Sequence, residues 1–242
     1  MSGYHPVVLG DVFNHQYKVI RKLSEGSYLT VWLAHNLNRY VALKILVSEI
    51  SESTTKLRIL RHIIEYTPEE GSRYITRLLD EFEHRGPNGL YKCLVLEPIG
   101  PSINTMVEEL PQFKPRRRGI KIRYPLQMAK SILKQSLQAL AFLLKNGIAH
   151  GDFQPGNILF PLIDVNSTPK ELLLQEEDAP QYLYIAQPLL PFTCYAEGFK
   201  VKLSDISGAY FFTDPPTKPV TPLGLRAHEL ILTRAVNNTV DI

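Results

Sequence analysis

The chain has 242 residues, of which 44% are hydrophobic and 21% are charged, and its formal net charge is +3 at pH 7. This length allows one large domain or two small lobes, and so small a charge does not indicate nucleic-acid binding. The basic run from Lys114 to Arg123 is local and is interpreted as a solvated loop before a helix. No stretch predicts a membrane span, and the first ten residues lack the pattern of a signal peptide. These features predict a soluble intracellular protein.

The first part of the chain predicts an antiparallel sheet. Residues 1–16 are polar and predict an extended lead-in. Five later segments are rich in alternating apolar residues and are predicted to be strands. Cys93 lies within one of them and is expected to be a buried thiol. The predicted strands are 17–23, 29–34, 40–46, 75–82 and 91–96.

The turn between the first two strands contains one glycine, Gly26. In the phosphate-covering pattern G-x-G-x-x-G-x-V, Ser24 and Leu29 take the places of the other two glycines, and Val31 follows. Glycine lets a backbone approach phosphate groups closely. The match is therefore weak by itself, and an ordinary hairpin remains an alternative.

A lysine follows in the third predicted strand. Val41-Ala42-Leu43-Lys44 is close to the V-A-I-K pattern, whose lysine pairs with phosphates. Burying an unpaired ammonium group is costly. Lys44 therefore either faces water at a sheet edge or pairs with phosphate, and the flanking hairpin favours the second interpretation.

Three helices are predicted around these strands. Residues 53–66 carry one apolar face, 102–109 form a short helix, and 125–146 form a long one that ends at Gly147. Between them, residues 94–100 predict a connection between two lobes. The apolar stripe of the long helix consists of Met128, Ile132, Leu133, Leu137, Leu140 and Leu143.

The segment that follows the long helix contains three closely spaced polar residues that could take part in catalysis. His150, Asp152 and Asn157 have the spacing of the kinase catalytic loop H-R-D-L-x-x-x-N, with Gly151 in the arginine position. Phosphoryl transfer requires positioning and charge neutralisation. Asp152 fits a carboxylate that orients the attacking hydroxyl, and Asn157 fits an amide ligand of Mg²⁺. Taken alone, the segment is equally well explained as a polar turn.

The remainder of the chain supplies two further matches. Residues 163–198 lack a sustained period and predict an irregular insertion. The segment 199–207 is predicted to contain a strand that leads into the acid Asp205, in Asp-Ile-Ser where the kinase pattern has D-F-G. Residues 222–229 resemble the end of an activation segment, and residues 240–241 predict the start of another helix.

Order and spacing make these matches significant together. Residues of the kinase pattern occur in the expected sequence at Gly26, Lys44, His150, Asp152, Asn157, Asp205 and Glu229. The chain thus resembles a eukaryotic protein kinase from its first strand to its last residue. Within that fold it is most similar to the SR-protein kinase family, on segments 23–34 and 88–97 and on the insertion.

The resemblance implies an α+β, bilobal fold with an N-terminal antiparallel sheet plus helix and an incomplete, mainly helical C-terminal lobe. The expected parts are an extension (1–16), an N-lobe (17–96), a hinge (97–100) and a partial C-lobe (101–242) that contains the insertion. Because the family continues through more helices, the chain is interpreted as a truncated product or fragment.

The resemblance also implies a site for ATP and Mg²⁺. Asp152, Lys44 and Asn157 are the expected catalytic residues, and Asn157 and Asp205 are the expected metal ligands. Leu96 is expected at the gatekeeper position. The residues expected to contact nucleotide are Ser24, Gly26, Val31, Ala42, Lys44, Leu96, Glu97, Ile99 and Gln154.

Several residues depart from the family pattern. Gln154 replaces a catalytic-loop lysine and removes a positive charge that would face the transferred phosphate. Lys56 stands where the helix would carry the glutamate partner of Lys44, and Glu52 lies one turn earlier. Together with the missing glycines, these departures weaken the inference of activity.

Three functions therefore remain. The first is an ATP-dependent serine/threonine protein kinase, monomeric, cytoplasmic or nuclear, acting on protein substrates among which Arg/Ser-rich proteins are candidates. It would contact neither nucleic acid nor membrane directly. The second is a pseudokinase that acts as a binding or regulatory module. The third is a small-molecule phosphotransferase, which the Val-Ala-Leu-Lys strand argues against.

Overall fold

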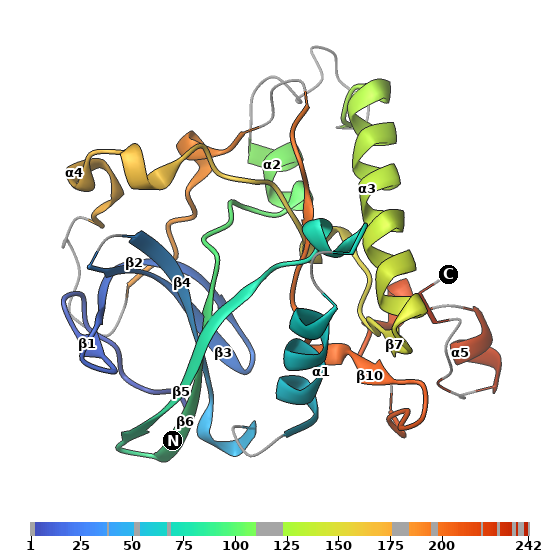
Figure 1. Cartoon of the computed structure of the whole chain (residues 1–242), viewed down its shortest axis with the longest axis horizontal. Helices are drawn as coiled ribbons and strands as arrows, with labels where there is room; N and C mark the ends of the chain where they lie inside the picture. The colour runs from blue at the N-terminus through green and yellow to red at the C-terminus, as the bar shows by residue number, and fades with distance from the viewer. Residues whose placement is uncertain are drawn as a thin grey trace. The chain divides into compact units, whose positions relative to one another are not determined.

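The chain forms two compact units, which are described separately. Unit 1 consists of residues 1–53, 77–100 and 162–194, and unit 2 consists of residues 54–76, 101–161 and 195–242. The structure is a computed structural model (Figure 1). It describes residues 3–37, 39–50, 54–66, 69–109, 123–175, 184–194, 198–218, 220–226, 228–233, 236 and 240–241.

Unit 1 is built on a six-stranded antiparallel sheet with strand order β1-β2-β3-β4-β6-β5 (Figure 1). Each of the hairpins β2–β3 and β5–β6 closes through a two-residue turn, and β3 pairs directly with β4. The strands are β1 (Val12–Phe13), β2 (Tyr17–Gly26), β3 (Leu29–Asn36), β4 (Arg39–Leu46), β5 (Leu78–Gly86) and β6 (Gly89–Leu96).

Both faces of the central strands are covered. Every β4 side chain from Tyr40 to Leu46 is buried, and five of them alternate between two separate apolar clusters on opposite faces. Val41, Leu43 and Ile45 pack on one face with Cys93 of β6. Burial raises the pKa of the Cys93 thiol to about 12, so the expectation of a buried thiol is confirmed.

The second face is covered by the segment expected to be an irregular insertion. Val165, Leu173 and Leu189 are buried in one cluster with sheet residues that include Leu33 and Ala42. Residues 162–194 therefore belong to unit 1, whereas the expected division placed them in the C-lobe. The physical reason is the apolar pattern of β4 on both faces, which requires a second covering layer.

Polar contacts fix this covering segment to β2. The Arg21 guanidinium donates to the carbonyls of Leu172, Leu173 and Leu174 at 3.2, 2.8 and 2.9 Å. These carbonyls end the short helix α4 (Lys170–Leu173), which lies beside β2 in Figure 1. A cation at a helix C-terminus satisfies carbonyls that lack intrahelical partners. Arg21 therefore acts as a side-chain cap for the insertion.

Unit 2 is mainly helical. Its helices are α1 (Thr54–Glu65), α2 (Ile103–Glu109), α3 (Leu126–Lys145) and α5 (His228–Thr233). Its strands form two antiparallel pairs, β7 (Ile148–Ala149) with β10 (Tyr210–Phe211) and β8 (Ile158–Leu159) with β9 (Lys202–Leu203). None of the helices that the structure describes is long and apolar enough to cross a membrane.

Helix α3 buries a different stripe from the one expected. Ile132, Leu140 and Leu143 are buried as predicted, but Leu133 and Leu137 are 56% and 52% exposed. The buried face runs through Gln135, Ser136, Ala139 and Phe142 instead. The buried Gln135 side chain is hydrogen-bonded to the segment that leads to Asp205. It donates to the Phe199 carbonyl and accepts from Val201 N–H. The apolar pattern alone predicted the wrong buried face of α3, because part of that face consists of hydrogen-bonded polar residues.

The expected strand 75–82 begins only at Leu78. Ile75 and Thr76 pair with Leu203 of β9 in unit 2, where Thr76 N–H donates to the Leu203 carbonyl at 2.9 Å. The segment therefore contributes to unit 2 before it enters the sheet of unit 1.

Replacement of Leu173 by alanine tests whether the insertion is part of the unit 1 core. Leu173 is fully buried, whereas its neighbour Leu172 is 59% exposed. We expect Leu173→Ala to lower the free energy of unfolding by about 2–5 kcal/mol, and Leu172→Ala to change it by less than about 0.5 kcal/mol. Urea denaturation of both variants measures this, and equal small effects would contradict the packing.

Candidate functional site

The loop between β7 and β8 contains the residues of the predicted catalytic loop. The strand pairs β7–β10 and β8–β9 hold the two ends of this loop. His150 is fully buried, and its ring Nε2 lies 3.0 Å from the carbonyl oxygen of Ser204, just after β9. His150 thus links the loop to the segment that carries Asp205.

The Asp152 carboxylate is buried and held by two amide side chains. Gln154 Nε2 lies 2.9 Å from both carboxylate oxygens, and Asn157 Nδ2 lies 2.9 Å from Oδ2. Asn157 Nδ2 also donates to the Asp152 carbonyl oxygen at 2.8 Å. Hydrogen bonds to an ionised group are roughly twice as strong as neutral ones. The two amide groups therefore hold the Asp152 carboxylate in a fixed orientation.

Asn157 and Asp205 offer oxygen atoms suited to a hard cation. Because Asn157 Nδ2 donates to Asp152, its Oδ1 is the atom that can ligate. Ser204 N–H donates to the Asn157 carbonyl at 2.8 Å, which places the start of the Asp205 turn beside Asn157. Among the described residues no group of three or more His, Cys, Asp or Glu could hold a metal by itself. An amide and a carboxylate fit Mg²⁺, which binds few protein ligands and completes its shell with phosphates and water.

The backbone of Asp205 is in an uncommon conformation. Its φ is 57°, in the left-handed region, and its Oδ1 accepts from Ser207 N–H at 3.3 Å. Aspartate tolerates this region better than most residues because its short side chain bonds locally. The conformation turns the chain sharply after β9.

Asp241 supports the backbone of the loop between β7 and β8, and the sequence analysis did not identify it as a site residue. Its carboxylate accepts from the backbone N–H groups of His150 and Gly151 at 2.6 and 3.0 Å. Burial raises the pKa of Asp241, while the proximity of His150 opposes this shift. An acid 90 residues further along the chain has no local motif, so only the tertiary fold could reveal this contact.

Gly151 occupies the position of the usual arginine for a steric reason. Its φ is +74°, and a β-carbon built on it would lie 2.2 Å from the Gly208 carbonyl oxygen. Gly208 follows Asp205 and is itself close to Asp152 Cβ. The Thr221 hydroxyl donates to the Gly151 carbonyl at 2.6 Å. The loop thus packs backbone against backbone, which leaves no room for a side chain at residue 151.

Two glycines with the same backbone conformation provide a matched test. Gly147 has a φ of +71° but open space around its Cβ position. We expect Gly147→Ala to cost about 1 kcal/mol of stability, from the left-handed conformation alone. Gly151→Ala should cost clearly more, because the loop must also move away from Gly208. Thermal melts of both variants measure the difference, and equal losses would contradict the close packing.

Unit 1 brings together most of the residues expected to contact nucleotide. Across the sheet, Ser24 is opposite Val31, Val31 opposite Lys44, and Ala42 opposite Leu96. Lys44 is buried. Val31, Ala42 and Leu96 lie in or against the apolar cluster that the insertion shares, so insertion side chains border this face of the sheet.

The remaining predicted residues have separate placements. Gly26 ends β2 at the hairpin turn, and its carbonyl accepts from the Tyr4 hydroxyl at 2.6 Å. The Glu97 side chain accepts from Arg77 N–H at 2.8 Å just after β6, and Ile99 follows in the same segment. Glu52 and the side chains of Lys56 and Glu229 lie outside the described residues.

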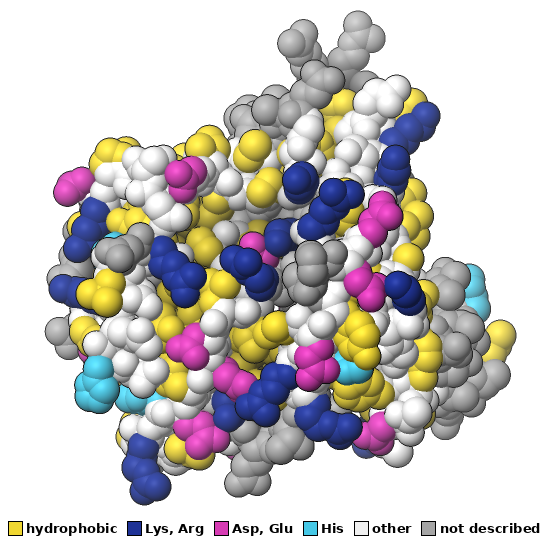
Figure 2. Space-filling model, in the orientation of Figure 1, with side chains coloured by type: hydrophobic (Ala, Val, Ile, Leu, Met, Phe, Trp, Pro, Cys, Tyr) yellow, Lys and Arg dark blue, Asp and Glu magenta, His cyan; other side chains and the backbone are white. Residues whose placement is uncertain are grey.

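The surface shown in Figure 2 carries charges of both signs. Dark blue Lys and Arg side chains alternate with magenta Asp and Glu side chains among the residues coloured there.

Comparisons with known proteins agree with the fold. Residues 17–168 match the family profile of the protein kinase domain. Protein kinase dsk1 of Schizosaccharomyces pombe is 39% identical over 166 residues, which cover 65% of this chain and 29% of that protein. SRSF protein kinase 3 of Homo sapiens is 37% identical over 165 residues, which cover 65% of this chain and 28% of that protein. The aligned part thus spans less than a third of these relatives.

A solved structure gives the same result for the fold alone. The crystal structure of a kinase domain superposes with a TM-score of 0.67 at 20% sequence identity. The match covers 96% of this chain and 62% of the other. The expected α+β kinase fold is therefore confirmed.

Proposed function

The chain belongs to the protein kinase family, and from that premise we propose that it transfers the γ-phosphoryl group of ATP to serine or threonine hydroxyls of proteins. The observation that carries the proposal is the buried Asp152 carboxylate, held by Asn157 and Gln154. A carboxylate fixed in this way can orient an attacking hydroxyl and accept its proton.

Each of the other residues is proposed for a role that its chemistry supports. Asn157 and Asp205 would hold Mg²⁺ through oxygen atoms, and the ion, when bound, neutralises charge on the triphosphate. Lys44 would contribute its ammonium group to the phosphates. His150 and Asp241 would position the loop backbone without touching substrate.

The adenine base is proposed to rest on unit 1. Val31 and Leu96 are partly buried apolar residues beside the buried Ala42, and these three would line the base, while the Glu97 and Ile99 backbone would supply its hydrogen bonds. An apolar surface with a few polar groups is typical of cofactor sites. Ser24 and Gly26, at the end of β2 just before the β2–β3 turn, would lie near the phosphates.

Gln154 is the main departure within the active loop. Its amide satisfies both oxygens of Asp152, but a neutral amide adds no positive charge toward the transferred phosphate. We therefore propose that Gln154 orients the base and that the enzyme lacks one of the usual cations that stabilise the transition state.

The proposed substrates are proteins, with Arg/Ser-rich proteins as the candidate class. The human relative is named as a kinase of SRSF proteins. We further propose a monomer that acts in the cytoplasm or nucleus, without direct contact with nucleic acid or membrane. The presence of Asp152, Asn157 and Asp205 supports a kinase over a pseudokinase despite the departure at Gln154, and the family profile does not favour a small-molecule phosphotransferase.

Replacement of Asp152 tests the proposed reaction. We expect Asp152→Ala to lower the rate of phosphate transfer to an Arg/Ser peptide by about 10²–10⁴-fold, because the base is lost. Binding of Mg-ATP should be nearly unchanged. Radiolabelled transfer and nucleotide titration measure the two effects. Equal transfer by both proteins would show that Asp152 has no catalytic role.

Replacement of Gln154 tests the missing cation. Gln154→Lys should raise kcat by about tenfold, because an ammonium group can both bond Asp152 and face the transferred phosphate. Gln154→Ala should lower kcat, because Asp152 loses two hydrogen bonds. Steady-state kinetics of the three proteins measure this series. A lysine variant slower than the alanine variant would contradict the proposed role.

A further inference from the structure

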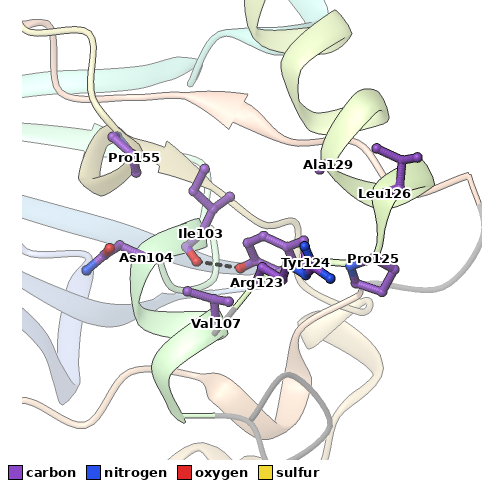
Figure 3. Close-up of a pocket in the computed structure, with 9 residues that line it drawn as sticks. All are labelled: Ile103, Asn104, Val107, Arg123, Tyr124, Pro125, Leu126, Ala129 and Pro155. Atoms are coloured by element: carbon purple, nitrogen blue, oxygen red, sulfur yellow. Dashed lines mark hydrogen bonds between the residues drawn. The ribbon is translucent and has the colours of Figure 1, made fainter. Parts of the chain in front are cut away.

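A groove of about 760 Å³ opens in unit 2 between helix α2 and the start of α3 (Figure 3). Its lining is mostly apolar and comes from three separate parts of the chain. Ile103 and Val107 lie on α2, Leu126 and Ala129 on α3, and Pro155 on the loop that holds Asp152. Its volume falls within the roughly 300–1,000 Å³ that ligand sites usually have.

Hydrogen bonds preform the two walls of the groove. The Tyr124 hydroxyl donates to the Ile103 carbonyl, which joins the segment before α3 to α2 (Figure 3). Burial raises the pKa of this phenol, so it remains a donor. The segment before α2 is in turn fixed to the end of β8, because Phe160 N–H donates to the Pro101 carbonyl at 3.0 Å.

The groove adjoins the catalytic loop. Pro155 lies three residues after Asp152, and three residues span at most about 11 Å of extended chain. A molecule in the groove would therefore lie close to where an acceptor hydroxyl must approach Asp152. This step rests on the proposed function.

A single charged side chain lines the groove among the described residues, the exposed guanidinium of Arg123. Guanidinium groups bind carboxylates with two parallel hydrogen bonds. The same charge would repel the arginines of an Arg/Ser repeat. The groove is therefore suited to an acidic, apolar segment and unsuited to the repeat itself.

We propose that this groove binds an anchoring segment of the protein substrate, in which branched aliphatic side chains stand next to an acidic residue. The aliphatic side chains fill the space between α2 and α3, and the carboxylate pairs with Arg123. The anchor is a separate part of the substrate from the serine that is phosphorylated.

Peptide binding tests the anchor without requiring catalysis. The probe is a fluorescein-labelled peptide, acetyl-Ala-Leu-Leu-Asp-Ala, titrated with the 242-residue chain and followed by fluorescence anisotropy. The comparison peptides carry Lys in place of Asp, or Ser-Ser in place of Leu-Leu. The chain should bind the first peptide and bind both comparison peptides more weakly.

Three variants locate the binding. Arg123→Glu should weaken binding of the acidic peptide by about tenfold and strengthen binding of the Lys peptide, because the charge is reversed. Ala129→Phe should weaken binding of both by filling the groove. Lys134→Glu makes the same charge change on an exposed part of α3 outside the groove and should leave binding unchanged. Thermal melts identify any variant that fails to fold. If Ala129→Phe does not fold, the test rests on the comparison of Arg123→Glu with Lys134→Glu.

Two results would overturn the inference. One is absence of binding of the acidic peptide by the unmodified chain. The other is an equal loss for Arg123→Glu and Lys134→Glu, which would show only general electrostatic attraction. Phosphate transfer is measured separately, with the anchor joined to a serine peptide. If the anchor binds through Arg123 but no acceptor is phosphorylated, the groove assignment stands and the proposed kinase function fails.

Discussion

The loop between β7 and β8, which is the proposed catalytic loop, depends on the carboxylate of Asp241, about 90 residues further along the chain. Asp241 accepts the backbone N–H groups of both His150 and Gly151, inside a buried environment. Unpaired, those two donors would each cost the free energy of a lost hydrogen bond. Their pairing fixes the direction in which the loop leaves β7, and the contacts of Asp152 with Gln154 and Asn157 follow from that direction.

Packing of backbone against backbone completes the same arrangement. Because Gly151 and Gly208 lie in direct contact, the turn that carries Asp205 is held next to the loop that carries Asp152. His150 adds a bridge to Ser204, and Ser204 bonds Asn157. The proposed base and the proposed metal ligands of unit 2 therefore share one network of hydrogen bonds and backbone contacts.

Unit 1 shows a second constraint, which comes from the sheet. Strand β4 is apolar on both faces, and a sheet of this kind is stable only when both faces are covered. The insertion supplies the second layer through Leu173 and its neighbours, and Arg21 holds it in place. Because this layer borders Val31, Ala42 and Leu96, the insertion and the proposed adenine surface form one continuous apolar structure within the unit.

The sequence by itself determined the family and the approximate positions of most elements, because these depend on local patterns. The alternation in 17–46 predicted the strands, and the spacing of His150, Asp152 and Asn157 indicated the kinase loop. Only the tertiary structure decided which α3 face is buried, where the insertion packs, and which acid supports the loop. These features depend on contacts between residues far apart in the chain, such as Asp241 with His150 and Leu173 with the sheet. Local sequence patterns do not reveal such contacts, because the two residues of each pair lie far apart in the chain.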